Sequence, residues 1–451
     1  MNEKLKNLLD LENEKYINKT KNSYIKHQTS QDVMPGGNTR TTQWMDPYPF
    51  FVKNASGLNI HDIDGNNYLD FMLNATTLIM GHAHPEIVRT LLNQIKEGTV
   101  YSAPTDGQFK LAEILVNRIP SIEKIRFTNS GTEATMMAIM AARSYTRKTK
   151  IAKFEGGYHG THDHVSVSVY PKKSELNEST HPGISEYSSQ PKSILEDVIV
   201  MPYNDIEKTK KLINKYKDDL SCIILEPIIS NFGYLPLDLE FLQFIRDITK
   251  ELNIVLIFDE IQSFRVSNGG AQEAFNIIPD MTTLGKVIGG GLPIGAFGGK
   301  DEIMDLFDPT SKNFDIAHAG TFNGNPLTME AGVTVMNNLK QNDFISMNNL
   351  GEELRKQLRS VFDEIDLPVQ VTGYASLFGI NFNENKITDY RSFIKNNSDI
   401  AKVFFAYLRN KGILLQVKNA GALNTLMTTN EIDFLVDSAR EIAIQIKEAV
   451  Y

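Results

Sequence analysis

The segment TTLGKVIGGGLPIGAFGG, from Thr282 to Gly299, contains a single charged side chain, that of Lys286. A lysine in apolar surroundings loses solvation of its charged form, so its pKa falls and its neutral amine can bond to a carbonyl carbon. A surface lysine whose ammonium reaches solvent is the ordinary alternative. The seven glycines from Gly285 to Gly299 do not favour an ordinary helix, and the segment offers no carboxylate as a partner. We therefore predict that Lys286 is a reactive amine.

Three further positions have residue types that suit a flat, anionic ligand. Asp259 follows five apolar residues, which places its carboxylate at the mouth of a buried strand, where it needs a cationic partner. The stretch Ser130-Gly131-Thr132 opens a helix directly after a strand, and its free backbone N–H groups favour a phosphate. Tyr158, beside two glycines, can lay its ring on a flat ligand. Taken singly, each has an ordinary alternative, which is a cap or salt bridge for Asp259, a plain helix N-cap for Ser130 and a core tyrosine for Tyr158, and the last two alternatives are the more frequent.

These residues follow the strands of a predicted parallel sheet. Five short β-rich runs alternate with helical patterns between 125 and 286, as is typical of parallel strands joined by crossover helices. Ligands bind beyond the carboxyl ends of such strands, so the residues after the runs should converge on one crevice. Glu226 follows the fourth run and joins this set. The runs are EKIRFTN, KIAKF, VIVMPY, CIILEP and IVLIFDE.

A chain of 451 residues is long enough for two or three domains. Residues 81–330 are predicted to form a large α/β domain that holds the crevice. Residues 1–80 contain an N-terminal helix and a hairpin-rich segment with its turn at Asp64-Gly65, and are predicted to be part of a small domain. Residues 331–451 combine amphipathic helices with strand-like pieces, which predicts a C-terminal α+β small domain.

Composition and charge argue against several classes of protein. The formal net charge of −9 does not suit a nucleic-acid binder, which needs a basic surface. Cys222 is the only cysteine and lies in an apolar run, so we expect a buried thiol and a reducing compartment. The N-terminus has no signal-peptide pattern, and no window reaches membrane-spanning length. We predict a cytoplasmic enzyme without a metal, nucleic-acid or membrane partner.

Together, the predicted groups meet the requirements of pyridoxal 5′-phosphate (PLP). They are an amine for its aldehyde, a site for its phosphate, a carboxylate for its ring nitrogen and an aromatic side chain for its ring. Asp259 would keep the ring nitrogen protonated, so that the ring withdraws electrons from the carbanion formed when the substrate loses a proton. Lys286 would release the aldehyde to the incoming amine and then carry that proton.

At this point the chain resembles a known family, the class III aminotransferases, which are fold type I PLP enzymes. The resemblance runs from about Pro35 to the C-terminus and includes SGTEA, GGYHG, DEIQ, the Lys286 segment and GTFNGNP in the family's order. It is strongest to the branch of glutamate-1-semialdehyde 2,1-aminomutase and the β-phenylalanine aminotransferases. The resemblance implies a homodimer. It also implies a fold type I α/β architecture, a mainly parallel seven-stranded sheet with helices on both faces, plus a smaller α+β domain.

The resemblance assigns roles to individual residues. It implies that Lys286 bonds to PLP and that Asp259 pairs with the pyridine nitrogen. It implies that Arg40 receives the substrate carboxylate, with Arg265 as the alternative. The further residues implied in cofactor binding are Ser130, Gly131 and Thr132 at the phosphate, Tyr158 and Ile261 on the two ring faces, Gln262 near the ring hydroxyl, Glu226 and His159 as supports, and Thr321 at the phosphate of the neighbouring subunit.

The sequence favours amino transfer between two molecules over a rearrangement within one. The donor would be a carboxylate-bearing amino acid, with β-amino acids as candidates, and the acceptor a keto acid such as 2-oxoglutarate or pyruvate. Aminomutases typically have a Ser-Trp-Gly-Pro segment where this chain has NATTLIM, and a glycine-rich mobile segment where it has HVSVSVYPKKSE. The stretch DEIQSFRV is also one residue shorter than the aminomutase pattern. An aminomutase, a PLP-dependent racemase, a non-catalytic PLP-fold protein and carrier-bound substrates stay open as alternatives.

Overall fold

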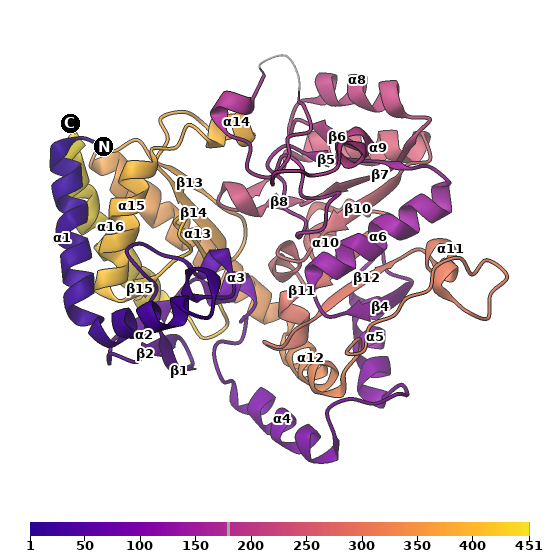
Figure 1. Ribbon diagram of the computed structural model, residues 1–451, viewed down its shortest axis with the longest axis horizontal. Coiled ribbons are helices and arrows are strands. Elements are labelled where there is room, and N and C mark those ends of the chain that lie inside the picture. Colours follow the sequence, from indigo (N-terminus) through magenta and orange to yellow (C-terminus); the bar gives the residue numbers. More distant parts are fainter. Residues whose placement is uncertain (178–180, 451) are drawn as a thin grey trace. The chain divides into compact units, whose positions relative to one another are not determined.

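The computed structural model describes residues 1–177 and 181–450, which fold into two compact units (Figure 1). The large unit comprises Pro85–Ile345 and Ile387–Ile394. The small unit comprises Met1–His84, Ser346–Lys386 and Lys395–Tyr451. These limits differ from the expected 81–330 in two ways. The helix that follows residue 325 packs on two helices of the large unit, and a short segment from the C-terminal third also belongs to that unit.

The large unit is built on a seven-stranded sheet within the described residues, with the order β4-β12-β11-β10-β7-β5-β6. Strand β12 is antiparallel to both of its neighbours, while the other six strands are parallel to one another. This confirms the predicted mainly parallel sheet, and all five predicted runs form strands. The strands are β4 (Lys124–Thr128), β5 (Lys150–Phe154), β6 (Val198–Met201), β7 (Leu220–Leu225), β10 (Val255–Asp259), β11 (Met281–Gly285) and β12 (Gly295–Gly299), with a separate pair β8 (Ile228–Ile229) and β9 (Leu235–Pro236).

Helices cover the sheet of the large unit and connect its strands. They are α4 (Pro85–Glu97), α5 (Asp106–Arg118), α6 (Gly131–Thr146), α7 (Lys192–Asp197), α8 (Ile206–Tyr216), α9 (Leu239–Glu251), α10 (Ala271–Phe275), α11 (Asp301–Met304), α12 (Pro326–Asn338) and α14 (Tyr390–Phe393). Shorter 3-10 turns are η3 (Lys173–Glu175), η4 (Ser230–Phe232), η5 (Ser263–Val266), η6 (Lys286–Gly289) and η7 (Asp305–Phe307).

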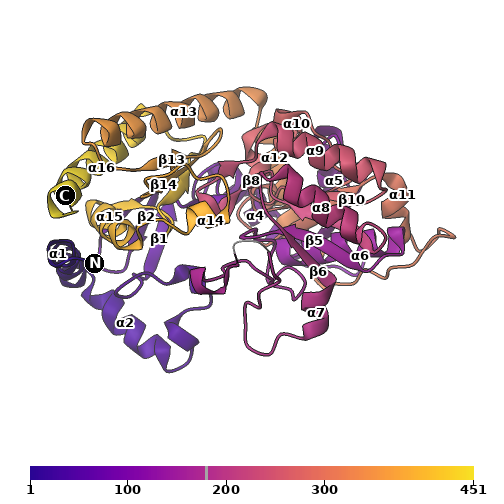
Figure 2. The ribbon, with the colours of Figure 1, turned by 90° about the horizontal axis from the view of Figure 1, so that it is seen from above.

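Two hydrophobic cores form on the two faces of this sheet because successive strand residues point to opposite sides. Ile257 of β10 packs in one cluster with Ala138 of α6. Phe258, the next residue, packs in a different cluster with Phe241 of α9. Figure 2 shows α6 and α9 on opposite sides of the sheet. Burial of each large apolar side chain contributes about 1.5–3 kcal/mol, so both faces hold the strands and fix where their ends lie.

Strands β11 and β12 were not predicted from the sequence. A Cβ atom on Gly295 would lie 2.0 Å from the carbonyl oxygen of Ser130, and one on Gly298 would lie 2.7 Å from that of Lys124. The close approach of β12 to the β4 chain therefore requires glycine. The run of β12, GAFGG, is rich in glycine and has no β-branched residue, which explains why the sequence did not predict this strand. Strand β11, MTTLG, is short and has only two β-branched residues, Thr282 and Thr283.

The small unit combines two sheets with long helices. Its helices are α1 (Glu3–Lys19), α2 (Lys21–Gln31), α3 (Leu73–Thr76), α13 (Gln341–Glu364, which begins in the large unit), α15 (Ser398–Lys411) and α16 (Thr429–Val450), with 3-10 turns η1 (Pro35–Gly37) and η2 (Thr41–Gln43). Its strands are β1 (Val52–Ser56), β2 (Asn59–Asp62), β3 (Asn67–Asp70) and β15 (Ile413–Leu414) in one sheet, and β13 (Gln370–Thr372), β14 (Leu377–Asn381) and β16 (Ala420–Ala422) in the other.

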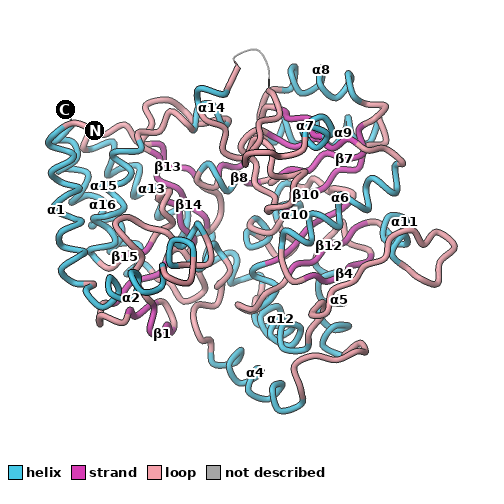
Figure 3. Tube along the Cα trace, in the orientation of Figure 1, coloured by secondary structure: helices cyan, strands magenta, loops and turns pink. Residues whose placement is uncertain are grey.

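The predicted features of the small unit are present. Strands β2 and β3 form an antiparallel hairpin whose turn contains Gly65 in the left-handed region, with φ +91°. Helix α16 buries Leu435, Ala439, Ile442 and Ile446, whose spacing defines one helix face. Helices α1, α15 and α16 pack against one another (Figure 3). No helix in the described part of the chain has both the length and the apolarity needed to cross a lipid bilayer.

Candidate active site

A cavity in the large unit lies where five parallel strands of the sheet end. Residues that directly follow β4, β5, β7, β10 and β11 converge on it, as the sequence analysis expected for a crevice at the carboxyl edge. The cavity is lined by Gly131, Thr132, Tyr158, His159, Gly160, Glu226, Asp259, Ile261, Gln262 and Lys286. Of these, only Gly160 was not among the residues named from the sequence.

Lys286 follows β11 directly and is the one lysine among the described residues that line the cavity. Its backbone is in the left-handed region, with φ 49°, which turns the chain sharply at the end of the strand. Burial lowers the pKa of Lys286, while the negative charges of Asp259 and Glu226 act in the opposite direction. A lowered pKa increases the share of neutral amine, which is the form that can attack an aldehyde.

Asp259 presents a carboxylate whose two oxygens are held in place. Its Oδ2 lies 2.8 Å from Nδ1 of His159, and its Oδ1 accepts hydrogen bonds from Thr283 Oγ1 at 3.1 Å and from the Ile261 backbone N–H at 3.2 Å. An ionised carboxylate only accepts hydrogen bonds, so Nδ1 of His159 carries the proton. Asp259 is 4% exposed, and this orientation leaves a fixed negative charge at the end of β10, facing the cavity.

The N-terminus of α6 forms another wall of the cavity. Ser130 is the N-cap, and its Oγ accepts the Glu133 N–H at 3.2 Å, while Glu133 Oε2 accepts the Asn129 N–H at 2.6 Å. This reciprocal capping fixes the first turn of α6, and Gly131 and Thr132 of that turn line the cavity. Backbone N–H groups in the first turn of a helix have no partner within the helix. The positive end of the helix dipole adds to these donors, and together they suit a phosphate. Ser130 itself caps the helix and does not line the cavity.

Two side chains pack closely around this wall. Ile261 lies against the first turn of α6, because a Cβ atom on Gly131 would be 2.5 Å from Ile261 Cδ1. Gly160 lies against Thr132, whose Oγ1 would be 2.6 Å from a Cβ atom at position 160. Position 160 therefore requires glycine, because its φ is +101° and the Thr132 Cα would also lie 2.8 Å from a Cβ atom there.

Glu226 supports the loop that carries Tyr158. Its Oε1 accepts the Tyr158 N–H at 3.1 Å, and its Oε2 accepts the Ser230 N–H at 3.1 Å. Burial raises the pKa of Glu226. Gln262 Oε1 accepts a hydrogen bond from the Tyr234 hydroxyl at 3.2 Å, which fixes that amide at the cavity wall.

Three residues named from the sequence lie elsewhere. Thr321 lines a separate pocket of the large unit, together with residues 100–105. Arg40 belongs to the small unit, where its Nη2 donates to Asn74 Oδ1 at 3.0 Å. Arg265 is completely buried in η5 and, like Arg40, does not line the cavity. Cys222 is buried, as expected, and burial raises its pKa to about 11.

The cavity residues fit PLP. Lys286 could bond to its aldehyde, Asp259 could hold its ring nitrogen, the first turn of α6 could hold its phosphate, and Tyr158 and Ile261 offer surfaces for the ring. The Nε2 atom of His159 is buried and has no hydrogen-bond partner among the described residues. A polar group of a bound ligand could supply that hydrogen bond. Within those residues, no cluster of three or more His, Cys, Asp or Glu side chains is arranged to hold a metal ion.

Comparisons with known proteins agree with this geometry. Residues 41–449 match the family model "Aminotransferase class-III". The chain is 40% identical to glutamate-1-semialdehyde 2,1-aminomutase of Methanobrevibacter smithii, over 94% of this chain and 97% of that protein. An omega-transaminase from Sphaerobacter thermophilus has a similar structure, with TM-score 0.90, 40% identity, and coverage of 94% and 98% of the two chains.

A β-phenylalanine aminotransferase from Variovorax paradoxus is also similar in structure, with TM-score 0.88, 29% identity and coverage of 97% of each chain. Solved structures similar to this chain hold PLP or its amine form. The fold type I architecture and the PLP cofactor predicted from the sequence are therefore confirmed. The chain belongs to the class III aminotransferases and is a PLP-dependent enzyme.

Proposed function

We propose that this enzyme transfers an amino group from a carboxylate-bearing amino acid to a keto acid. The observation that carries the proposal is the meeting of Lys286, Asp259 and the N-terminus of α6 in one cavity. An amine with a lowered pKa, a fixed carboxylate and a phosphate-binding helix end are the three groups that PLP-dependent amino transfer needs from its protein.

The protein groups have separable tasks in this reaction. When bound, PLP supplies an aldehyde that accepts an amine and a ring that withdraws electrons from the substrate carbon. The amine of Lys286 removes a proton from that carbon and returns it at another position. The carboxylate of Asp259, held by His159 and Thr283, would stabilise positive charge at the ring nitrogen without having to reorient. Tyr158, which lines the cavity, would cover one face of the ring and exclude water there.

The segment after GGYHG supports transfer between two molecules over an aminomutase reaction. Residues 161–177 contain no glycine, and backbone groups within this segment are held by hydrogen bonds. Glu186 Oε1 accepts the N–H groups of Val169 and Tyr170 at 2.6 and 2.9 Å, and the hydroxyl of Tyr390 donates to Pro171 O at 2.9 Å. Rearrangement within one substrate requires the intermediate to be retained, which favours a mobile cover. A fastened segment suits exchange of two free substrates.

We also propose a homodimer in which Thr321 reaches the phosphate site of the other copy. Val88, Leu92 and Ile95 lie along one face of α4 and are 39%, 58% and 58% exposed, and Phe322, beside Thr321, is 59% exposed. Exposed apolar stripes of this kind favour a protein interface. Arg40 would receive the substrate carboxylate, for which a planar guanidinium is well suited.

The test is a panel of α-, β- and ω-amino acids, each incubated with 2-oxoglutarate or pyruvate and the purified PLP-loaded enzyme. We expect a new keto acid from the donor and the matching amino acid from the acceptor, in equal amounts. Lys286→Ala serves as the control for contaminating activity. Light scattering of the same sample gives the oligomeric state, which we expect to be dimeric.

A parallel reaction with glutamate-1-semialdehyde and no acceptor separates the alternatives. Efficient conversion to 5-aminolevulinate, without turnover of the donor panel, would establish the aminomutase reaction and contradict the proposal. Inversion of configuration without nitrogen exchange would indicate a racemase. Absence of a PLP absorbance band from the purified and PLP-incubated protein would contradict both the proposed function and its alternatives.

A further inference from the structure

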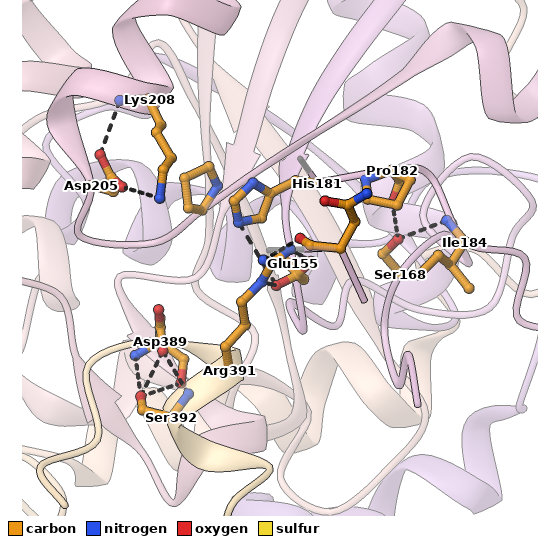
Figure 4. Close-up of polar contacts among 12 residues, drawn as sticks. Glu155, Ser168, His181, Pro182, Ile184, Asp205, Lys208, Asp389, Arg391 and Ser392 are labelled. Atoms are coloured by element: carbon orange, nitrogen blue, oxygen red, sulfur yellow. Dashed lines mark hydrogen bonds and ion pairs between the residues drawn. The ribbon is translucent and has the colours of Figure 1, made fainter. Parts of the chain in front are cut away.

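Arg391 makes an ion pair that the reaction described above does not use. It lies in the segment 387–394, which is far along the chain from the cofactor loops but belongs to the large unit. Its Nε donates to Glu155 Oε2 at 2.7 Å and its Nη2 donates to Glu155 Oε1 at 3.0 Å, which is a bidentate arrangement (Figure 4). Glu155 is only 3% exposed, so this pair is shielded from solvent on the carboxylate side.

Glu155 is the first residue after β5 and stands three positions before Tyr158. The chain between them is held by the Glu155 N–H, which donates to Met201 O at 2.9 Å, and by the Gly156 N–H, which donates to Ser168 O at 2.8 Å. The carbonyl of Gly156 accepts from Asn231 Nδ2 at 2.9 Å. The bidentate pair with Arg391 therefore holds the base of a short, hydrogen-bonded loop whose tip, Tyr158, lines the Lys286 cavity.

Aromatic packing couples the segment 387–394 to the same loop. Gly156 has φ +82°, and a Cβ atom there would lie 2.4 Å from Tyr390 Cδ2 and 2.7 Å from Phe232 Cε1. The ring of Phe393 stacks on that of Phe232, with ring centroids 5.2 Å apart. Phe232 is in η4, beside Ser230, whose N–H is held by Glu226. The segment thus contacts both loops that place Tyr158 and Glu226 at the cavity.

The segment is itself rigid, which is necessary if it is to position anything. Asp389 and Ser392 cap each other, with Ser392 N–H and Oγ donating to Asp389 Oδ1 at 2.8 and 2.6 Å (Figure 4). Asn204 Nδ2 donates to Thr388 O at 2.8 Å, and Arg391 Nη1 donates to Asn177 O at 2.6 Å. Arg391 is therefore oriented from both sides of its pair with Glu155.

We propose that Arg391 is a positioning residue for the PLP reaction, which holds the 155–158 loop through Glu155 and so sets the place of Tyr158 against the cofactor ring. The inference rests on the proposed placement of PLP in the Lys286 cavity. A displacement of about 1 Å at a reacting group can change rate by up to roughly a hundredfold, so a residue that never touches the cofactor can control its orientation.

The test compares Arg391→Met and Arg391→Lys with a matched control, Arg246→Met. Arg246 pairs with Asp280 at 3.0 Å and is similarly shielded, at 15% and 8% exposure for the two side chains. Asp280 precedes β11, at the opposite end of that strand from Lys286. The measurements are the melting temperature of the apoprotein, the Kd of PLP by absorbance titration, the visible circular dichroism of the bound cofactor, and kcat and KM determined separately.

Arg391→Met is expected to raise the Kd of PLP about tenfold and to change the cofactor's visible circular dichroism, with a fall in kcat larger than any change in KM. Arg391→Lys should recover part of the loss, because it keeps the charge but not the fork. Arg246→Met should lower the melting temperature alone. Glu155→Gln should add little in the Arg391→Met background, because both changes remove the same pair.

The proposal is overturned if Arg391→Met and Arg246→Met lower the melting temperature alike while the Kd and the dichroism stay at the wild-type values. Additive effects of Glu155→Gln and Arg391→Met would also overturn it. If Arg391→Met does not fold, Glu155→Gln and Arg391→Lys give the same decision through the same measurements. A wild-type protein that fails to attach PLP at Lys286 contradicts the proposed function instead, so the two failures are distinguishable.

Discussion

Among the described residues of the large unit, two lysines have pKa values lowered by burial, and only one of them can do chemistry. Lys153 is in the interior of β5, with no exposed surface, and its Nζ donates to Val167 O at 2.6 Å. Burial lowers the pKa of Lys153 to about 7. Lys286 also has its pKa lowered by burial, but its amine faces a cavity. The difference shows that burial adjusts the protonation of an amine, whereas access to a cavity decides whether that amine can react.

The largest expected effect comes from Lys286→Ala. Loss of the reacting amine should lower kcat by at least ~10³-fold, because both covalent attachment and proton transfer are lost. Reduction with borohydride followed by peptide mass spectrometry should find PLP on Lys286 in the wild type and on no peptide in the variant. Lys153→Met is the matched control and should keep the adduct on Lys286. An adduct on Lys153 in either protein would contradict the comparison.

Asp259→Asn should have the next largest effect. The substitution keeps the size of the side chain but removes its negative charge, so we expect kcat to fall by roughly 10²–10³-fold. The corresponding change at a buried carboxylate away from the cavity, Asp280→Asn, should reduce stability and leave kcat within a few fold. Equal losses of kcat from both variants would show that fold stability, and not position at the cavity, determines the rate.

Because Lys153 is buried, it should make the free energy of unfolding increase with pH. Its folded pKa of about 7 is below the ordinary value of 10.5, so between these pH values the unfolded chain binds more protons than the folded one. The free energy of unfolding should therefore rise with pH across this window, by at most about 5 kcal/mol from this group. Chemical denaturation of wild type and Lys153→Met at pH 7 and pH 10 isolates the contribution. No change in their difference would contradict the assignment.

Cys222 extends the comparison to a thiol and should show the smallest effect. It is completely buried in β7, and burial raises its pKa to about 11, so thiolate and access are both lacking. A thiol reagent should label the native protein slowly and label it fully after denaturation. Cys222→Ala should leave kcat unchanged and cost about 1–2 kcal/mol of stability. Fast labelling of the native protein would show that burial alone does not protect this group.

Most residues that line the cavity could be predicted because a local sequence pattern marks them. An apolar run followed at once by Asp259 or by Ser130-Gly131-Thr132 predicts both a strand and what lies at its end. The burial of Lys153 could not be predicted in this way, because the run KIAKF is compatible with either an exposed or a buried lysine at this position. Which side of a strand is covered depends on helices that pack on it from elsewhere in the chain.

The pairing of Glu155 with Arg391 could not be predicted either. The two residues are separated by 236 positions, and no periodicity in the sequence links them. The segment 387–394 falls within residues 331–451, which the sequence analysis assigned to the small domain, whereas in the structure it belongs to the large unit. Contacts of this kind depend on the whole chain path and can be obtained only from the folded structure.

Lys286 has a left-handed backbone conformation, which glycine adopts with less strain than lysine. For residues other than glycine this conformation costs on the order of 1 kcal/mol, and Lys286→Gly would relieve it. A selection for thermal robustness alone would therefore favour discarding the very residue on which turnover depends. Any stabilising redesign of this enzyme has to keep lysine at position 286 and place its stabilising substitutions at other positions.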